Sequence, residues 1–337
     1  MSKVRWGLLS TASIGRVVVA ACRRARAAEF VAVASRGPER AQRFADEFGL
    51  EASFGSYDEL LAADDVDAVY VALPNSMHAE WVQNALEAGK HVLCEKPFAP
   101  TAEETITCFD AAKAAGRVCV EGFMYRHHPQ TTKFRELLAD GAIGELTFVR
   151  SALSTRTEPS DIRRSTEMAG GSLADLGAYC ASATRLVAGE PLQVFAEQVL
   201  DGPQGVDLRF AATIRLENGV VAQFDTGLDL PRRDELELIG TTGRIVVPDP
   251  WLCRSGYVEL VRDSETSRIP VDPDGTFALT EADHDVYRIE FDAVSTAILT
   301  GSPPVFDATD AVRQARLIDA LRASAQDGSP VSLPALQ

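Results

Sequence analysis

Short apolar runs alternate with longer amphipathic stretches from residue 4 to about residue 123, and this alternation most constrains the fold. Such a pattern is typical of a parallel sheet whose strands are joined by crossover helices. The sequence predicts strands at Val4–Leu9, Phe30–Ser35, Ala68–Leu73, His91–Cys94 and Val118–Gly122, and helices at Ile14–Ala28, Pro38–Phe48, Tyr57–Ala63, Met77–Ala88 and Ala102–Ala115. We therefore expect a doubly wound α/β domain of the Rossmann type over residues 1–123.

The pattern changes after about residue 140. Long alternating segments, separated by turn signals such as Asn218-Gly219 and Thr242-Gly243, indicate hairpins of an antiparallel sheet. Helical patterns occur at Ser172–Ala188, Asp283–Thr300 and Ala308–Ala325. We expect a second, α+β domain over residues 124–304, with a mostly antiparallel open sheet and helices on one face. Residues 305–337 are predicted to form a C-terminal helix and tail that pack back on the first domain.

The net charge limits the partners of this chain. With 33 basic and 49 acidic residues the formal charge is −16, which gives no general attraction for nucleic acid or anionic membranes. An anionic ligand must then be held by a local basic cluster. There is no apolar run of 18 residues and no signal-peptide pattern, and the six cysteines lack metal-ligand spacing. These features favour a cytoplasmic protein with reduced core thiols and no metal.

The turn after the first predicted strand stands where a dinucleotide-binding fingerprint, G-x-G-x-x-G, would stand. Serine and alanine replace the first two glycines, so the motif is degenerate, and an ordinary strand-to-helix turn is the alternative. Its position at the start of a helix nevertheless favours a bound pyrophosphate. The candidate cofactor-binding residues in this turn are Ser10, Thr11, Ala12, Ile14 and Gly15.

The second strand ends in Ser35 and Arg36, where a site for NAD would carry an acidic residue against the ribose 2′-hydroxyl. Serine and arginine would instead hydrogen-bond and neutralise a 2′-phosphate. We therefore predict NADP as the cofactor, with NAD less favoured, and Arg40 as a second cation. The alternative is that Arg36 only solvates the end of the strand.

Two further strand ends carry polar side chains at the edge where open α/β sheets bind ligands. One contributes Leu73, Pro74, Asn75 and His78, and the other contributes Glu95 and Lys96, and all six are candidate cofactor-binding residues. The chain has only five lysines against 28 arginines. Lysine can shift its pKa and donate a proton near neutral pH, which arginine cannot, so Lys96 is a candidate for proton transfer.

Glu95-Lys96-Pro97, the preceding segment 72–78 and the degenerate turn together resemble the Gfo/Idh/MocA family of oxidoreductases. Residues 121–130 resemble the domain junction of its NADP-dependent pyranose dehydrogenases, and residues 170–179 resemble its G-G-x-x-x-D-x-G-x-x-[HY] helix. The resemblance implies catalytic roles for Lys96, Asp175 and Tyr179, which with Arg163 would also bind substrate, and it adds Arg126 to the cofactor site. Positions 175 and 179 would share one face of a helix. Alternatively, Ser172 and Asp175 form a capping box.

The family resemblance implies hydride transfer between nicotinamide C4 and a sugar carbon. We expect oxidation at C1 of an aldopyranose such as D-xylose or D-glucose, with Lys96 and Tyr179 moving the proton. An unperturbed phenol has a pKa of about 10, so Tyr179 would need a nearby cation. The alternatives are a ketoreductase or C3-dehydrogenase acting on a glycoside or nucleotide-linked sugar, and a catalytically silent NADP-binding regulator.

The resemblance also implies a homodimer or homotetramer formed through the second sheet. Weaker candidates for substrate contact, placed near the domain junction or the late helix, are His127, His128, His284 and Tyr287.

Overall fold

The protein, seen in a computed structural model that describes residues 2–279 and 285–334, divides into two compact units. The first contains Met1–Met124 and Ala282–Ala315, and the second contains Tyr125–Glu281 and Arg316–Gln337. The first change of unit falls next to the predicted boundary at residue 123. The late part of the chain is divided differently from the prediction, because residues up to 315 belong to the first unit and residues from 316 to the second.

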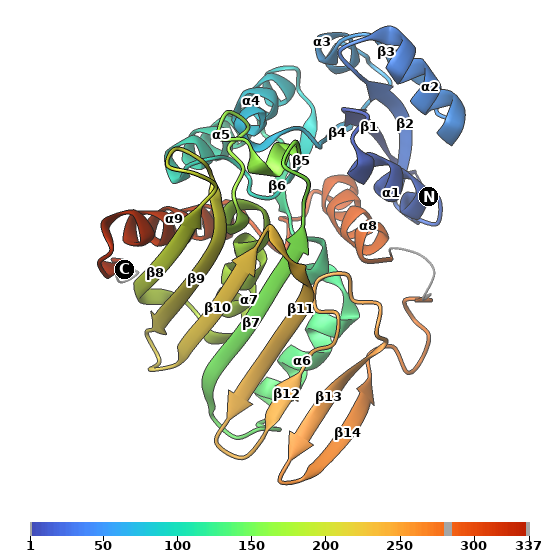
Figure 1. The fold of residues 1–337 in the computed structure, drawn as a ribbon. Helices are drawn as coiled ribbons and strands as arrows, with labels where there is room; N and C mark the ends of the chain where they lie inside the picture. The colour runs from blue at the N-terminus through green and yellow to red at the C-terminus, as the bar shows by residue number, and fades with distance from the viewer. Residues whose placement is uncertain (1, 280–284, 335–337) are drawn as a thin grey trace. The chain divides into compact units, whose positions relative to one another are not determined.

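The first unit is built on a six-stranded parallel sheet with the order β3-β2-β1-β4-β5-β6 (Figure 1). Its strands are β1 (Val4–Leu9), β2 (Ala28–Ala34), β3 (Ala52–Phe54), β4 (Ala68–Val71), β5 (His91–Glu95) and β6 (Cys119–Gly122). Its crossover helices are α1 (Ser13–Cys22), α2 (Pro38–Phe48), α3 (Tyr57–Leu61), α4 (His78–Glu87) and α5 (Ala102–Ala115). The predicted doubly wound fold is confirmed, with the short edge strand β3 as an addition.

Apolar side chains of α3, α4 and α5 pack against the sheet in one core, which includes Leu60, Val82 and Phe109. Helix α8 (Asp285–Thr300) packs against α1, β1 and β2. Its Phe291 is fully buried, with ring centroids 4.8 Å from Trp6 and 5.1 Å from Phe30. Burying a phenylalanine stabilises a fold by about 1.5–3 kcal/mol, so α8 is an integral part of the first unit rather than of the predicted range 124–304.

The second unit contains a nine-stranded sheet with the order β14-β13-β12-β11-β7-β10-β9-β8-β15 (Figure 1). Neighbouring strands are antiparallel except for β7 and β10, which run parallel. Its strands are β7 (Leu146–Arg156), β8 (Pro191–Leu200), β9 (Asp207–Leu216), β10 (Val221–Gly227), β11 (Asp229–Gly240), β12 (Arg244–Val246), β13 (Tyr257–Arg262), β14 (Glu265–Pro270) and β15 (Val331–Ser332). The predicted mostly antiparallel sheet is confirmed.

Helices α6 (Pro129–Ala139) and α7 (Ala178–Ala188) pack against this sheet, α6 on β13 and α7 on β7 and β10. The last helix, α9 (Ala308–Asp327), is shared, because the change of unit falls between Ala315 and Arg316. Strand β15 then pairs with β8. The end of the chain therefore adds a strand to the second sheet, whereas the sequence predicted that all of 305–337 packs on the first domain.

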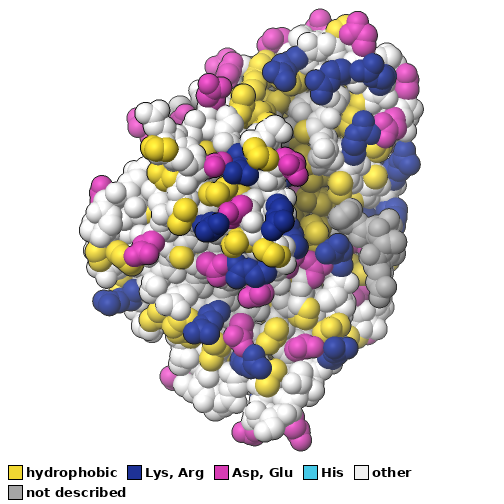
Figure 2. Space-filling model, in the orientation of Figure 1, with side chains coloured by type: hydrophobic (Ala, Val, Ile, Leu, Met, Phe, Trp, Pro, Cys, Tyr) yellow, Lys and Arg dark blue, Asp and Glu magenta, His cyan; other side chains and the backbone are white. Residues whose placement is uncertain are grey.

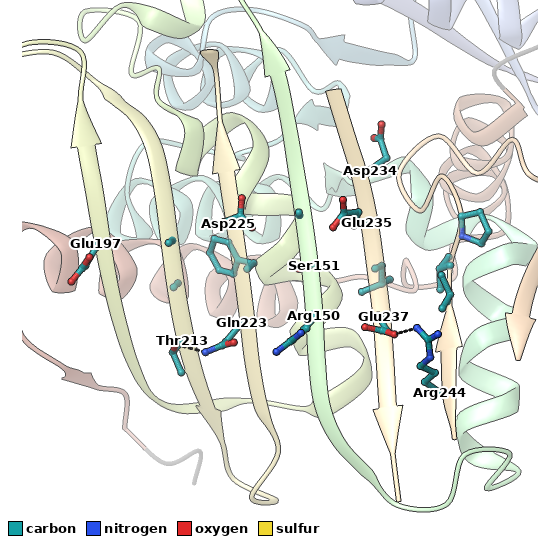
Figure 3. Close-up of a pocket in the computed structure, with 18 of the residues that line it drawn as sticks. Arg150, Ser151, Glu197, Thr213, Gln223, Asp225, Asp234, Glu235, Glu237 and Arg244 are labelled. Atoms are coloured by element: carbon teal, nitrogen blue, oxygen red, sulfur yellow. Dashed lines mark hydrogen bonds and ion pairs between the residues drawn. The ribbon is translucent and has the colours of Figure 1, made fainter. Parts of the chain in front are cut away.

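The two faces of the second sheet differ in chemistry. In β9, Phe210, Ala212 and Ile214 are buried, whereas Arg209 and Thr213 on the other face are exposed. The open face is hollowed over a volume of about 760 Å³, and Figure 3 shows charged and polar side chains of β7, β8, β10 and β11 lining it. The apolar alternation of β9 is thus satisfied within the chain, and the polar face is left open.

All six cysteines are buried and free, as the sequence predicts for core thiols. None of the helices in the described ranges combines the length and apolar character needed to cross a membrane.

Candidate functional site

The turn between β1 and α1 has serine and alanine where a dinucleotide-binding fingerprint has glycines, and the serine adopts a backbone conformation typical of glycine. Ser10 has a φ of +100°, a conformation that normally favours glycine, and its Oγ accepts a hydrogen bond from the Ala12 amide at 3.0 Å. Gly15 is retained because a Cβ there would lie 2.7 Å from Leu8 Cδ2 of β1. The turn therefore keeps the close helix–strand packing of a dinucleotide site despite its degenerate sequence.

A basic pair lies at the end of β2, next to the turn. Ser35 is buried at the strand end, and Arg36 and Arg40 are exposed. Burial raises the pKa of the Tyr57 phenol, and the charges of Arg36 and Arg40 oppose this rise, which places both cations near that ring. Within the described ranges neither arginine forms an ion pair. Figure 2 shows Lys and Arg side chains gathered over the part of this unit that contains α2 and β3.

His78 joins the two loops that follow β4 and β5. It is fully buried, with Nδ1 2.8 Å from the carbonyl oxygen of Pro97 and Nε2 2.9 Å from that of Leu73. Burial lowers its pKa although both carbonyl groups favour the protonated ring. The sequence placed His78 among the cofactor-binding residues. In the structure both ring nitrogens contact backbone carbonyl oxygens. His78 therefore orders the loop of Leu73, Pro74 and Asn75 against the loop of Lys96.

The Glu95-Lys96-Pro97 loop is held from two further sides. The Tyr70 hydroxyl of β4 donates to Glu95, and the Phe98 amide donates to Glu121 of β6 at 3.0 Å. Burial, followed by the charge of Glu95, raises the pKa of Tyr70 well above its usual value, so it remains a donor. These contacts fix the backbone on both sides of Lys96, whose side chain is partly exposed at the carboxyl end of β5.

In the second unit, two glycines allow a loop to lie directly against the segment 170–179. The Gly171 amide donates to the carbonyl oxygen of Arg163 at 2.8 Å, and Gly170 donates to that of Ser165 at 2.9 Å. A Cβ on Gly170 would lie 2.3 Å from the Arg163 oxygen, far inside normal contact. The Gly-Gly pair is thus required by backbone packing, and it holds Arg163 next to the helix that follows.

That helix begins with a π-helical turn, η4 (Leu173–Gly177), before α7 continues as a regular α-helix. The Ala178 amide reaches back five residues to the carbonyl of Leu173. The predicted continuous helix over 172–188 is therefore interrupted at the motif itself, and such π turns are frequent at functional sites. Asp175 is the one residue of 171–185 that is not buried, so the turn directs this carboxylate outward.

Asp175 and Arg163 are brought together. Arg163 Nη1 lies 3.5 Å from Asp175 Oδ2, and the same guanidinium makes a bidentate pair with Asp161 at 2.8 and 2.9 Å. The hydrogen bond from Arg163 holds the pKa of Asp161 below its usual range, so this pair persists well into the acid range. The capping box that was the alternative for Ser172 and Asp175 is absent, because the Ser172 side chain does not cap the helix and its hydroxyl donates to Asp207.

Tyr179 lies in the first turn of α7 within an aromatic cluster. Its ring centroid is 5.6 Å from that of Trp251 and 6.1 Å from that of Tyr125. One turn further on, Ser182 contacts the Tyr125 hydroxyl at 2.5 Å and accepts from Arg126 Nε at 2.8 Å. The buried Arg126, predicted as a cofactor ligand, is thus anchored to the helix that carries Tyr179. These ring contacts fix the orientation of the Tyr179 side chain.

Of the weaker candidates for substrate contact, His128 has a structural role. His128 Nδ1 accepts from the Gln130 amide and caps α6. Burial lowers the pKa of His127 to about 4, so this ring is neutral near neutral pH. Tyr287 is buried in α8, and His284 lies outside the described residues. In the ranges that the structure describes, no group of three or more His, Cys, Asp or Glu side chains is placed to hold a metal ion.

Sequence reasoning missed Trp251 and Asp207. Trp251 lies in a loop between β12 and β13, and Asp207 begins β9. Both meet the 170–179 segment only through tertiary folding, so no local motif marks them. A tryptophan in a segment rich in Pro and Asp was the signal that the sequence offered, and it does not identify a partner.

A dinucleotide-type sheet with an exposed basic pair, followed by an α+β unit with an ordered Asp–Tyr helix, defines a two-domain oxidoreductase. A family model described as an oxidoreductase family with an NAD-binding Rossmann fold matches residues 4–123, and the GFO/IDH/MocA C-terminal domain matches residues 131–246. The chain belongs to the Gfo/Idh/MocA family of oxidoreductases.

Relatives with known activities fall into more than one reaction class. The chain is 37% identical to D-xylose 1-dehydrogenase (NADP⁺) 2 of Haloferax volcanii over 97% of its length and 99% of that protein. A solved 3-ketoreductase from Actinomadura kijaniata, in complex with NADP and TDP-benzene, has a TM-score of 0.86 and 33% identity, covering 96% of this chain and 98% of that one. An aldose-aldose oxidoreductase from Caulobacter crescentus has a TM-score of 0.87 and 25% identity, covering 98% and 100%.

Proposed function

We propose that this protein is an NADP-dependent sugar dehydrogenase that oxidises C1 of a free aldopyranose, such as D-xylose or D-glucose. The broader description, an NADP-dependent sugar oxidoreductase, rests on the family and on relatives of several activities. The narrower choice of substrate rests mainly on one observation, the neutralisation of the arginines in the loop before the Gly-Gly pair.

A nucleotide-linked sugar carries two phosphates, which need cations that are available for binding. Arg163 is instead paired with Asp161 and Asp175, and Arg164 with Asp201 at 2.7 Å. Of the three arginines in this part of the chain, Arg156 alone is exposed, and one cation is a weak site for a diphosphate. A neutral sugar suits this arrangement, because it needs no free cation and its hydroxyls can hydrogen-bond the paired carboxylates and guanidinium groups.

The first unit has residues that fit NADP. The turn of Ser10 and Gly15 offers amide groups at the start of α1, and Arg36 and Arg40 are available for a 2′-phosphate. When bound, NADP supplies a hydride acceptor at nicotinamide C4. We propose that Tyr179 takes the proton of the sugar hydroxyl, that Lys96 hydrogen-bonds the same oxygen and favours the deprotonated phenol, and that Asp175 orients the sugar.

The deciding experiment follows NADP⁺ reduction at 340 nm across free aldoses, glycosides, polyols and nucleotide-linked sugars. We expect turnover with free aldopyranoses, and a lactone as the product of C1 oxidation. Turnover of a nucleotide-linked 3-keto sugar with NADPH, and of no free aldose, would replace this proposal with a 3-ketoreductase, as the similarity to the Actinomadura enzyme suggests. Tight NADP binding with no turnover of any sugar would indicate a binding-only regulator.

Arg36→Asp is expected to lower kcat/KM for NADP⁺ by about 10- to 100-fold, because hydrogen bonds to charged groups contribute about 1.5–3 kcal/mol. With NAD⁺, kcat/KM should stay the same or rise, since an acidic residue there suits a ribose 2′-hydroxyl. The matched control is Arg135→Asp, an exposed arginine on α6 with the same change of charge. Steady-state kinetics with both cofactors measure the ratio, and an unchanged ratio would refute the 2′-phosphate assignment.

We further propose a homodimer or homotetramer, located in the cytoplasm, in which a second copy covers the open face of the second sheet. That face has the hollow lined by polar and charged side chains, including the Glu237–Arg244 ion pair drawn in Figure 3. Light scattering on the purified protein gives the mass of the assembly, and a monomeric mass would contradict this proposal.

A further inference from the structure

A carboxylate from β9 binds the beginning of the motif helix, that is, η4 and α7 together (residues 173–188). Asp207 Oδ2 accepts hydrogen bonds from Ser172 Oγ at 2.8 Å and from the Leu173 amide at 2.6 Å. Burial raises the pKa of Asp207, and these two hydrogen bonds oppose the rise. Leu173 is the first residue of the π turn, so Asp207 binds the turn at the point where its register begins.

The backbone is shaped to admit this carboxylate. Gly171 has a φ of +120°, and a Cβ at this position would lie 2.1 Å from Asp207 Oδ1. The second glycine of the motif is therefore required by a residue 36 positions away in the sequence. From β10, Thr226 Oγ1 donates to Ser172 Oγ at 3.2 Å, and this orients the serine hydroxyl toward Asp207.

The register of the π turn determines how Asp175 lies relative to Tyr179. A π turn holds one residue more than an α-helical turn, and each residue of an α-helix advances by about 100°. Relaxation of the turn to a regular α-helix would change the angle about the helix axis between Asp175 and Tyr179. The ion pair with Arg163, which depends on the outward direction of Asp175, would be lost as well.

We propose that Asp207 is a positioning residue, which fixes the π turn and thereby the relative placement of the Asp175 and Tyr179 side chains for catalysis. This inference rests on the proposed function, because it assumes that Asp175 and Tyr179 both act on the sugar. Asp207 contacts neither reacting group directly and acts through Ser172 and the Leu173 amide.

The test uses Asp207→Asn in the full-length protein with NADP⁺ and the best sugar found in the substrate panel. We expect kcat to fall by about 10- to 100-fold, since a displacement of 1 Å in a catalytic group can cost about 100-fold. The KM for NADP⁺ should stay within about twofold, because the change lies in the other unit. Asp229→Asn is the matched control: Asp229 begins β11, and its carboxylate accepts hydrogen bonds from the exposed Arg209.

Hydrogen exchange provides a second measurement that does not depend on turnover. Amides of residues 173–178 should exchange at least about tenfold faster in Asp207→Asn than in the control, because the first hydrogen bond of the turn is weakened. Ser172→Ala, a milder change in the same network, should shift kcat in the same direction, and the double variant should be less than additive. If Asp207→Asn does not fold, Ser172→Ala tests the same hydrogen-bond network by kcat and hydrogen exchange.

The outcomes separate this inference from the proposed function. Normal kcat and normal exchange in the Asp207 and Ser172 variants, with Tyr179→Phe inactive, would overturn the positioning role alone. Faster exchange with unchanged kcat would also overturn it, since the turn would then not govern catalysis. If no sugar is turned over by the wild type, the proposed function fails, and the exchange measurement still decides whether Asp207 holds the turn.

Discussion

Tyr179→Phe and Lys96→Ala should each lower kcat by about 10²- to 10⁴-fold, the usual contribution of a proton-transfer group. Phenylalanine keeps the ring that packs against Trp251 and Tyr125, so the change removes only the hydroxyl. The Lys96 change removes the cation from a loop whose backbone is held by His78, Tyr70 and Glu121. Binding of NADP should change by less than about threefold, because neither variant alters the basic pair at Arg36.

The matched controls are Tyr257→Phe and Lys113→Ala. Tyr257 is on β13, where the Arg268 guanidinium of β14 packs over its ring, and Lys113 is exposed on α5. Both controls should keep normal kcat and should unfold within about 2 °C of the wild type, as expected for surface changes of up to about 0.5 kcal/mol in a chain of this length. Stopped-flow and steady-state kinetics with a free aldose measure the effect. Near-normal turnover in both site variants would eliminate the proposed proton-transfer pair.

The first unit was predictable because its information is local. Most of its strands read as short apolar runs, and two of its helices, α2 and α5, end at Gly49 and Gly116 in the left-handed conformation. The candidate cofactor residues follow from the same logic, since they lie at strand ends. Helix α8 was predicted as a helix but was assigned to the wrong unit. Its own sequence pattern does not indicate which sheet buries Phe291.

The second unit shows where local patterns stop being informative. The alternation in β9 correctly predicts a buried and an exposed face. The π turn could not be predicted, because its register is set by Asp207, which lies in β9 and is distant in the sequence. His78 illustrates the opposite case: its position after a strand end predicted ligand contact, yet its two ring nitrogens lie 2.8 and 2.9 Å from backbone carbonyl oxygens. Whether a side chain at a strand end contacts a ligand, or only orders the loop that contacts it, is therefore decided by its tertiary partners and not by motif spacing.

Gly170→Ala should be among the most damaging single changes in the second unit. The new Cβ would lie 2.3 Å from the carbonyl oxygen of Arg163, so the chain must move and the Gly171–Arg163 hydrogen bond, now 2.8 Å, must lengthen or break. Backbone strain of about 1–3 kcal/mol and a lost hydrogen bond of about 0.5–1.5 kcal/mol together predict a decrease of about 2–4 kcal/mol in the free energy of unfolding.

Activity should fall further than stability alone explains, because Arg163 is tied through its backbone to Gly171 and through its side chain to Asp175. The control is Gly219→Ala in the β9–β10 turn, where φ is +84° and a Cβ would meet open space. Its cost should be about 1–2 kcal/mol from left-handed backbone strain, with normal kcat in the folded fraction. Urea unfolding and kcat per folded molecule separate the two effects. If Gly170→Ala resembles Gly219→Ala in both measurements, the loop of Arg163 can move away without disturbing Asp175, and the role assigned to this contact is wrong.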